Sequence, residues 1–368
     1  MTLVHVLTPG FVSPNGRAFL FPLVRHRRAL RDRRIRLRFF APGSEPAKLT
    51  DCDALILDSK IYDARWLVDS DGILEEIAEL ARRAPKLFYF SIGDSTGWDH
   101  CRPLPLVTAV VKNQLLRDRA RYLQPFYGNR LYTDHYHRQA GLHDEDEASS
   151  EPIADAALLD KLLVGWNSGL ADYSLHGPLR MGLYHRLPLD ALLRFPEWHV
   201  PADAPRDLEV SCRIGTAYAR ATVAWQRQEV ARVLADRLGT GKLSRRSYMA
   251  ELARAKIVVS PFGLGEITLR DFEIFLAGAL ALKPDMSHME TWPDLFRDGE
   301  TMVAFRWDLG DLEEIIERML DDEAGRLAIA AEAQARYRRH LVWPEAAELF
   351  CDRFEAILRT GDPPRDGA

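Results

Sequence analysis

Short continuous apolar runs alternate along this chain with longer stretches of mixed polarity. Apolar runs at Leu3–Thr8, Leu87–Ile92 and Ile257–Val259 predict strands that are buried on both faces of a parallel sheet. The intervening stretches, such as Gly72–Arg83 and Thr222–Leu238, have the amphipathic pattern of helices. The alternation of strand and helix predicts an α/β fold.

The alternation occurs twice, which indicates two domains. The second series starts at Leu208–Cys212, after the segment Phe195–Arg206, which holds three prolines in twelve residues and reads as a linker. A length of 368 residues also exceeds the usual limit of a single core. We therefore expect an N-terminal domain over residues 1–195, a C-terminal domain over 206–344 and a terminal helix over 345–360.

The most strongly patterned unit is Lys256–Pro284, which predicts a strand, a glycine-containing loop, a helix over Ile267–Ala279 and a second strand. At about 100° per residue, Glu266, Arg270 and Glu273 fall on one face of that helix. This charged stripe has two interpretations. Either Glu266 and Arg270 form an ordinary i, i+4 ion pair, or the stripe lines a crevice beyond the carboxyl end of the strand, where open α/β sheets bind ligands. In the second case the N–H groups of Gly263, Leu264 and Gly265 would face an anion.

The residues of this unit resemble a known family. SPFGLGE followed by LRDFEIFLAGALAL, then METW and DLFRDGE, is similar to the donor-binding half of GT-B glycosyltransferases, in the branch called glycosyl transferases group 1. The resemblance covers roughly residues 245–345. It implies two Rossmann-like domains that face a central cleft, with the C-terminal helix returning to the N-terminal domain.

The resemblance also implies roles for the two glutamates. Glu266 matches the position that contacts the donor sugar, as a catalytic residue, and Glu273 matches the position that holds the ribose of the nucleotide. Six residues separate them here, one fewer than in the usual pattern. Loops like the one after the first strand approach the donor phosphates in such enzymes, through Gly16 and Arg17.

Further candidates follow the ends of other predicted strands. Arg213 follows the strand Leu208–Cys212 and is either a diphosphate-binding residue or an ordinary surface arginine. Asp94 follows Leu87–Ile92 and is either a catalytic base or a cap or turn residue, and Asp99 and His100 are further candidate bases. No DxD-like motif occurs in a fitting place, so we expect no metal and no cofactor, with arginines stabilising the departing diphosphate.

The residues and the resemblance together predict a glycosyltransferase. It would move a sugar from a nucleotide-activated donor to a glycan or lipid-linked acceptor, in bacterial surface polysaccharide or glycoconjugate synthesis. Retention of the anomeric configuration is expected, and inversion with a base such as Asp94 stays open. The alternatives are a sugar-nucleotide epimerase of the same fold and a non-catalytic nucleotide-sugar binding protein.

Charge and cysteine content limit the partners and the compartment. The net charge of −5 gives no general preference for nucleic acid. Eight arginines crowd into Arg25–Arg38, which is either a solvated helix face or a patch for an anionic membrane or acidic glycan. Four widely separated cysteines fit neither a zinc site nor a disulfide framework, and the apolar segments are too short to span a bilayer. We expect a cytoplasmic protein, in contact with the inner face of the membrane if the arginines bind lipid.

Two further segments carry expectations. Asn113–Tyr122 is basic and has the pattern of a helix. Asp134-His135-Tyr136-His137 resembles half of a metal site, but without a partner cluster the histidines are expected at the surface or facing substrate.

Overall fold

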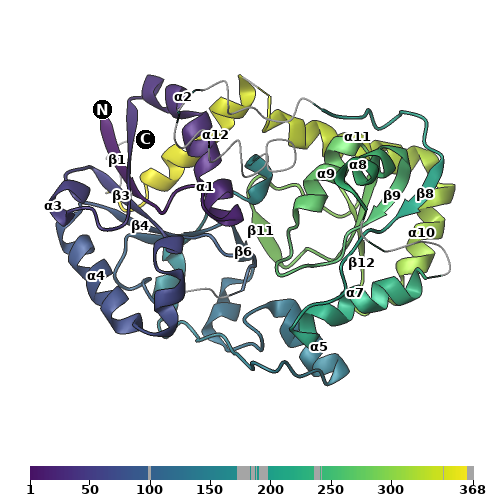
Figure 1. Cartoon of the computed structure of the whole chain (residues 1–368), viewed down its shortest axis with the longest axis horizontal. Helices are drawn as coiled ribbons and strands as arrows, with labels where there is room; N and C mark the ends of the chain where they lie inside the picture. Colours follow the sequence, from purple (N-terminus) through teal and green to yellow (C-terminus); the bar gives the residue numbers. More distant parts are fainter. Residues whose placement is uncertain are drawn as a thin grey trace.

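The computed structural model shows two α/β lobes side by side, with the last helix of the chain lying against the first lobe (Figure 1). It describes residues 1–97, 101–171, 183, 187, 189, 198–235, 241, 243–342 and 344–362. The predicted helix within Gly177–Leu193 lies outside the described residues, except for three isolated positions, as do the candidate bases Asp99 and His100.

The N-terminal lobe is built on a six-stranded parallel sheet in the order β2-β1-β3-β4-β5-β7. Its strands are β1 (Thr2–Leu7), β2 (Ile35–Phe40), β3 (Ala54–Asp58), β4 (Leu87–Ser91), β5 (Ala109–Lys112) and β7 (Leu162–Val164). Its helices are α1 (Pro14–Arg25), α2 (Arg27–Asp32), α3 (Pro46–Leu49), α4 (Ser70–Arg83) and α5 (Leu131–Ala140). Short 3₁₀ turns join them at Ser59–Ile61, Asp63–Leu67, Arg119–Leu123, Ala156–Lys161 and Ser168–Leu170.

The C-terminal lobe is built on a four-stranded parallel sheet in the order β12-β10-β9-β8. Its strands are β8 (Leu208–Ser211), β9 (Ala255–Val259), β10 (Leu280–Pro284) and β12 (Val303–Phe305). Its helices are α7 (Ala221–Val233), α8 (Arg245–Arg254), α9 (Leu269–Ala277), α10 (Leu312–Asp321) and α11 (Glu323–Arg339). The buried strands are continuous apolar runs, as a parallel sheet covered on both faces requires.

The C-terminal helix α12 (Glu345–Leu358) returns to the N-terminal lobe, as predicted. Its apolar face, which includes Phe350, Phe354 and Ile357, is buried in the same core cluster as Phe19 of α1 and Val4 of β1. Two parallel sheets in two lobes, with the terminal helix crossing back, are the arrangement of the GT-B fold.

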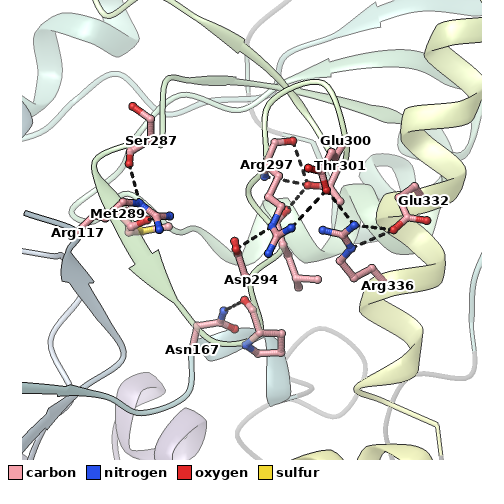
Figure 2. Close-up of polar contacts among 12 residues, drawn as sticks. Arg117, Asn167, Ser287, Met289, Asp294, Arg297, Glu300, Thr301, Glu332 and Arg336 are labelled. Carbon is pink, nitrogen blue, oxygen red and sulfur yellow. Dashed lines mark hydrogen bonds and ion pairs between the residues drawn. The ribbon is translucent and has the colours of Figure 1, made fainter.

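The two lobes share a strand pair, which the sequence did not predict. Gln114–Leu116 forms β6 and pairs antiparallel with β11 (Met289–Thr291) of the other lobe. The predicted helix over Asn113–Tyr122 is therefore wrong, because β6 finds its partner about 170 residues away along the chain. Figure 2 shows how Arg117 extends this contact: its Nε donates to Ser287 O at 3.2 Å and its Nη2 to Met289 O at 3.0 Å.

The helix α5 belongs to the predicted N-terminal domain by sequence but packs against the C-terminal lobe. Tyr132 and Tyr136 of α5 are buried in a core cluster with Phe262 and Val223 of the C-terminal lobe. Asp144, in the acidic segment after α5, accepts hydrogen bonds from Thr222 N at 3.0 Å and Thr222 Oγ1 at 2.8 Å, at the start of α7. The predicted N-terminal domain 1–195 thus contributes to the packing of both lobes. No helix in the described part of the chain is both long enough and apolar enough to cross a membrane.

Candidate functional site

The helix α9 begins later than predicted, and this separates the two glutamates. Thr268 is the N-cap of α9 and forms a capping box with Asp271, in which Thr268 N donates to Asp271 Oδ2 at 2.8 Å. Glu266 therefore lies in the loop before the helix, and Glu273 lies on the helix. The predicted stripe of Glu266, Arg270 and Glu273 on one helix face is wrong, because the capping box sets the start of the helix at Leu269.

Five of the predicted residues lie on the wall of one pocket, which we call the arginine pocket. It has a volume of about 550 Å³ at the carboxyl ends of β8 and β9. The predicted residues on its wall are Arg213, Gly263, Leu264, Arg270 and Glu273. Ile214, Gly215, Tyr218, Arg227, Leu243, Arg245, Tyr248 and Thr268 complete it. Four arginines and one carboxylate line this pocket, so its electrostatic character favours an anion.

Glu273 is the acidic group of the arginine pocket. Its side chain is about one-tenth exposed, and Arg245 Nη1 lies 3.4 Å from its Oε1. Burial raises the pKa of Glu273 above its ordinary value, although Arg245 and the Tyr248 hydroxyl act in the opposite direction. A buried carboxylate with one long ion pair retains free acceptor positions for hydroxyl groups of a ligand.

Two further arginines of the pocket are held by hydrogen bonds within the C-terminal lobe. Arg213 forms a bidentate ion pair with Glu251 of α8, with Nε–Oε1 at 2.9 Å and Nη2–Oε2 at 2.8 Å. Arg270 Nη2 donates to the backbone oxygen of Arg213, while Arg270 Nη1 is buried without a hydrogen bond among the described residues. The paired Arg213 is held in place by Glu251, and Arg270 keeps a free donor for a ligand.

The remaining arginines of the pocket were not predicted. Arg227 of α7 is buried, donates to Gly215 O at 2.6 Å and to Phe262 O at 2.8 Å, and packs on the ring of Tyr218. Burial lowers its pKa. Arg245 begins α8. Nothing in their local sequence marks either residue, because α7 and α8 are brought to the pocket by tertiary packing.

One of the three loop amides that the sequence predicted for anion binding is engaged within the loop before α9. Gly263 N donates within the loop to Gly265 O at 3.0 Å. Thr268 N is satisfied by Asp271 in the capping box. Gly263 and Leu264 lie on the pocket wall, and the Gly263 amide is not free to face a phosphate. Anion binding by the Leu264 and Gly265 amides stays a prediction.

Glu266 lies at the contact between the lobes, which we call the seam. Its carboxylate is fully buried and accepts hydrogen bonds from Thr96 N at 3.0 Å and Thr96 Oγ1 at 2.6 Å. His288 Nε2 lies 3.8 Å from Oε1. Burial acts to raise the pKa of Glu266, but His288 and Thr96 outweigh it and the pKa lies below the ordinary value. Glu266 lines neither of the pockets described here, and its contact with a donor sugar stays a prediction.

Gly265 and Asp94 meet directly at the seam. A Cβ atom at Gly265 would lie 1.6 Å from the backbone oxygen of Asp94, so only glycine permits this approach of the two loops. The Asp94 carboxylate is exposed, and its Oδ1 accepts a hydrogen bond from Asn15 Nδ2 at 2.7 Å. Both residues line a second pocket of about 420 Å³, the seam pocket, with Ser13, Pro14, Asn15, Lys60, Ser168, Leu264, Ile267, Thr268 and Leu269.

The seam pocket adjoins the arginine pocket. Leu264 and Thr268 line both, so a single loop separates the two spaces. Asp94 is therefore placed near a space beside the arginine pocket, where an acceptor could lie. Gly16 lies in neither pocket: its N–H donates to Ser13 Oγ at 3.0 Å and it is buried in the first turn of α1. Arg17 is buried and directs Nη1 toward Phe11 O at 3.4 Å.

A further carboxylate in the N-terminal lobe was missed. Asp58 ends β3, is fully buried, and accepts hydrogen bonds from Thr8 Oγ1 at 2.7 Å and Lys60 N at 2.9 Å. Burial raises the pKa of Asp58 to about 6. A carboxylate that ends a continuous apolar strand is visible in the sequence, and it marks the same sheet edge as the seam pocket.

The histidines of α5 do not form a metal site with their neighbours. His137 Nδ1 lies 2.6 Å from Leu142 O, and His135 packs edge-on against Trp307. Among the described residues, no group of three or more His, Cys, Asp or Glu side chains is placed to hold a metal ion.

Comparison with known families finds a match in the C-terminal part of the chain. Residues 200–352 match the family described as glycosyl transferase-like. This range contains the whole of the C-terminal sheet and all the residues of the arginine pocket. The match confirms the resemblance to glycosyltransferases that the motifs predicted for this part of the chain. No curated protein sequence matches the chain.

Solved structures with a similar chain path include two bacterial proteins. HepE of Anabaena, solved in complex with UDP-glucose, shares 11% identity at a TM-score of 0.44, over 97% of this chain and 100% of that one. A glycosyltransferase from Rickettsia africae shares 9% identity at a TM-score of 0.46, over 97% of this chain and 99% of that one.

Proposed function

We propose that the protein is a glycosyltransferase that takes a sugar from a nucleoside-diphosphate donor bound in the arginine pocket. One observation carries this proposal: four guanidinium groups and the buried Glu273 line the same pocket, at the carboxyl edge of a parallel sheet. The family match over residues 200–352 supports it. Guanidinium groups suit the diphosphate, and a carboxylate suits the ribose hydroxyls.

The donor would lie with its diphosphate near Arg213 and Arg270 and its ribose at Glu273. The charge that develops as the nucleoside diphosphate departs would be stabilised by these arginines, as preorganised donors in a partly closed pocket. The acceptor, a glycan or a lipid-linked glycan, would occupy the seam pocket beside Asp94, on the other side of Leu264. No metal is required in this proposal, and activity in the presence of a chelator tests that point.

The first experiment is a thermal-shift screen of the purified full chain with UDP-, GDP-, CMP- and dTDP-sugars. A ligand that binds only the native state raises the melting temperature, by an amount that follows its concentration and affinity. Donors that bind are then incubated with and without glycan acceptors. Transfer that depends on the acceptor supports a glycosyltransferase, release of an epimerised nucleotide sugar supports the epimerase, and binding without turnover supports the binding protein.

The stereochemical outcome is a separate part of the proposal. Retention is implied by the resemblance to the two-glutamate branch, and inversion would use Asp94 as the base. The anomeric configuration of the first product, followed by NMR, distinguishes the two. Replacement of Asp94 by Asn should abolish transfer in the inverting case and leave most of it in the retaining case.

We also propose that the protein contacts an anionic membrane surface through exposed arginines next to α2. Arg31, Arg34, Arg36 and Arg38 are exposed and form no ion pair within the described part of the chain, whereas Arg33 pairs with Asp352 and Glu355 of α12. Arg36 and Arg38 lie on β2, the edge strand of the sheet. Such a surface would hold the protein at the cytoplasmic side of the membrane. There it could reach a lipid-linked acceptor of a bacterial surface-polysaccharide or glycoconjugate pathway.

Sedimentation with liposomes tests this contact. Binding to anionic but not neutral vesicles, reduced by salt and by the double variant Arg36→Gln/Arg38→Gln, supports it, since each basic residue near an anionic surface contributes about 1 kcal/mol. The double variant Arg121→Gln/Arg318→Gln, at exposed arginines elsewhere, is the matched control. Equal and negligible sedimentation with both kinds of vesicle contradicts the membrane contact.

A further inference from the structure

Arg245 occupies one end of the arginine pocket. It is the first residue of α8, its side chain is half exposed, and its one ion pair within the described residues is the 3.4 Å contact from Nη1 to Glu273 Oε1. A single long contact leaves the other N–H groups of the guanidinium available to a ligand. The adjacent Arg246 is also exposed but is not on the pocket wall.

Three residues of α8 contribute to the pocket or support its wall. Glu251, which holds Arg213, lies six residues after Arg245, or about 9 Å along the helix axis. Tyr248 lies between them and contributes to the environment of Glu273. Among the arginines of the pocket, Arg245 is thus the one that forms an ion pair with Glu273 within the described residues, whereas Arg213 is held by Glu251.

The contact between Arg245 and Glu273 places Arg245 within reach of the base of a donor whose ribose lies at Glu273. In a nucleoside diphosphate the ribose lies between the phosphates and the base. If the diphosphate lies at Arg213 and Arg270 and the ribose at Glu273, the base lies beyond Glu273, where Leu243 and Arg245 form the wall. This step rests on the proposed function.

The chemistry of the guanidinium group limits which bases fit there. Arginine carries only hydrogen-bond donors and cannot lose its proton at ordinary pH. It pairs well with the carbonyl oxygens of uracil, thymine or guanine, and it meets a second donor at the exocyclic amine of cytosine or adenine. Uracil and cytosine are the sharpest pair, because they differ mainly in a carbonyl against an amine at one ring position.

We propose that Arg245 reads the base of the donor and selects nucleoside diphosphates whose base presents a carbonyl oxygen at C4 of a pyrimidine or C6 of a purine over those that present an amine there. It is a specificity-determining residue, and it acts by direct contact with the nucleotide. The ion pair with Glu273 holds its guanidinium against the pocket wall before the nucleotide binds.

Calorimetry of the full chain with UDP and CDP tests this proposal, with GDP and ADP as a second pair. We expect the unmutated protein to prefer UDP over CDP by about 5- to 100-fold, the range of a good guanidinium–base contact. Arg245→Ala should weaken UDP by a similar factor and leave CDP within about twofold, so the preference collapses. Arg245→Lys should keep part of the preference, and Arg246→Ala should keep all of it. Melting temperatures without ligand check that each variant is folded.

The other outcomes each overturn a distinct statement. If Arg245→Ala weakens UDP and CDP by the same factor, Arg245 contacts the phosphates or the ribose and the base reading is wrong. If it changes neither affinity, the pair with Glu273 is structural and the base reading is again wrong. If the unmutated protein binds UDP and CDP equally well, base selection fails while the proposed function stands. If it binds none of the four nucleotides, the proposed function fails as well.

Discussion

The two glutamates of the α9 region, seven positions apart, lie in opposite environments. Glu266 is fully buried at the seam and accepts two hydrogen bonds from Thr96 of the other lobe. Glu273 lies on a pocket wall with one long ion pair and free acceptor capacity. The first carboxylate already accepts two hydrogen bonds from the protein, and the second accepts only one long contact and faces a pocket. The comparison teaches that two carboxylates close in sequence can differ in how many of their acceptor positions the fold leaves open to a ligand.

The largest effect is expected at the glycine next to Glu266. Gly265→Ala would place a Cβ atom against the backbone oxygen of Asp94, and neither loop can move without breaking the seam. We expect a loss of at least about 3 kcal/mol in the free energy of unfolding, at the upper end of the cost of overpacking. Urea denaturation measures it.

Gly215→Ala is the matched control, because a Cβ atom there meets no atom within 4 Å. It should change the free energy of unfolding by less than about 1 kcal/mol. Equal stability of the two variants would contradict the close approach of the loops.

Glu266→Gln should reduce stability by about 1.5–3 kcal/mol, the value of hydrogen bonds to a charged group. The amide has one oxygen acceptor in place of two, so one of the Thr96 donors stays unpaired. The affinity for UDP should stay within about twofold, because Glu266 lines neither pocket. Glu75→Gln, at an exposed position of α4, is the control for stability. A large loss of nucleotide affinity with unchanged stability would show that Glu266 belongs to the donor site.

Glu273→Gln should show the reverse pattern. It removes the charged acceptor proposed for the ribose, and the affinity for nucleoside diphosphates should fall by about 10- to 100-fold, or roughly 1.5–3 kcal/mol. Stability should not fall, because burial already disfavours the ionised form of this carboxylate. Calorimetry and urea denaturation of the same preparation measure the two quantities. Unchanged nucleotide binding would remove Glu273 from the site.

The smallest expected effect is a difference in pH dependence. The pKa of Glu273 is raised in the folded protein, so its contribution to stability is most favourable at low pH and declines as the pH rises above about 4.5. The pKa of Glu266 is lowered, so its contribution is present above about 4.5 and is lost as the pH falls through the folded value. In the unmutated protein Glu273 should lower the melting temperature as the pH rises, and Glu273→Gln should remove that decline. Glu266 should raise the melting temperature as the pH rises, and Glu266→Gln should remove that increase. Profiles of both variants from about pH 2.5 to pH 8, a range that includes the titration of Glu266 below about 4.5, that match the unmutated protein would contradict the assignment.

The parts of the fold that depend on local pattern could be predicted from the sequence. The continuous apolar runs Leu3–Thr8, Leu87–Ile92 and Ile257–Val259 located strands of both parallel sheets to within about two residues, and the helix predicted over 345–360 spans Glu345–Leu358. Burial on both faces leaves a strong signal in a few neighbouring residues. The arrangement of two lobes with a returning helix followed from the family resemblance.

The parts that depend on distant partners could not be predicted. β6 has the local pattern of a helix and becomes a strand because β11 lies beside it. Arg227 and Arg245 reach the pocket only through the packing of α7 and α8. The placement of Glu266 on a helix face was wrong for a local reason. Thr268 and Asp271 form a capping box, whose spacing is visible in the sequence and marks the start of α9 at Leu269.

The strand pair β6–β11 also decides how the chain can be divided. A fragment that starts near residue 198 would keep the C-terminal sheet but lose β6, and with it Tyr132 and Tyr136 from the core around Phe262. Such a fragment would expose an unpaired strand edge next to an apolar cavity, which are two properties that promote aggregation. We therefore expect the region matched by the family to be unstable when it is expressed alone, and expression of the C-terminal lobe to require residues 114–144.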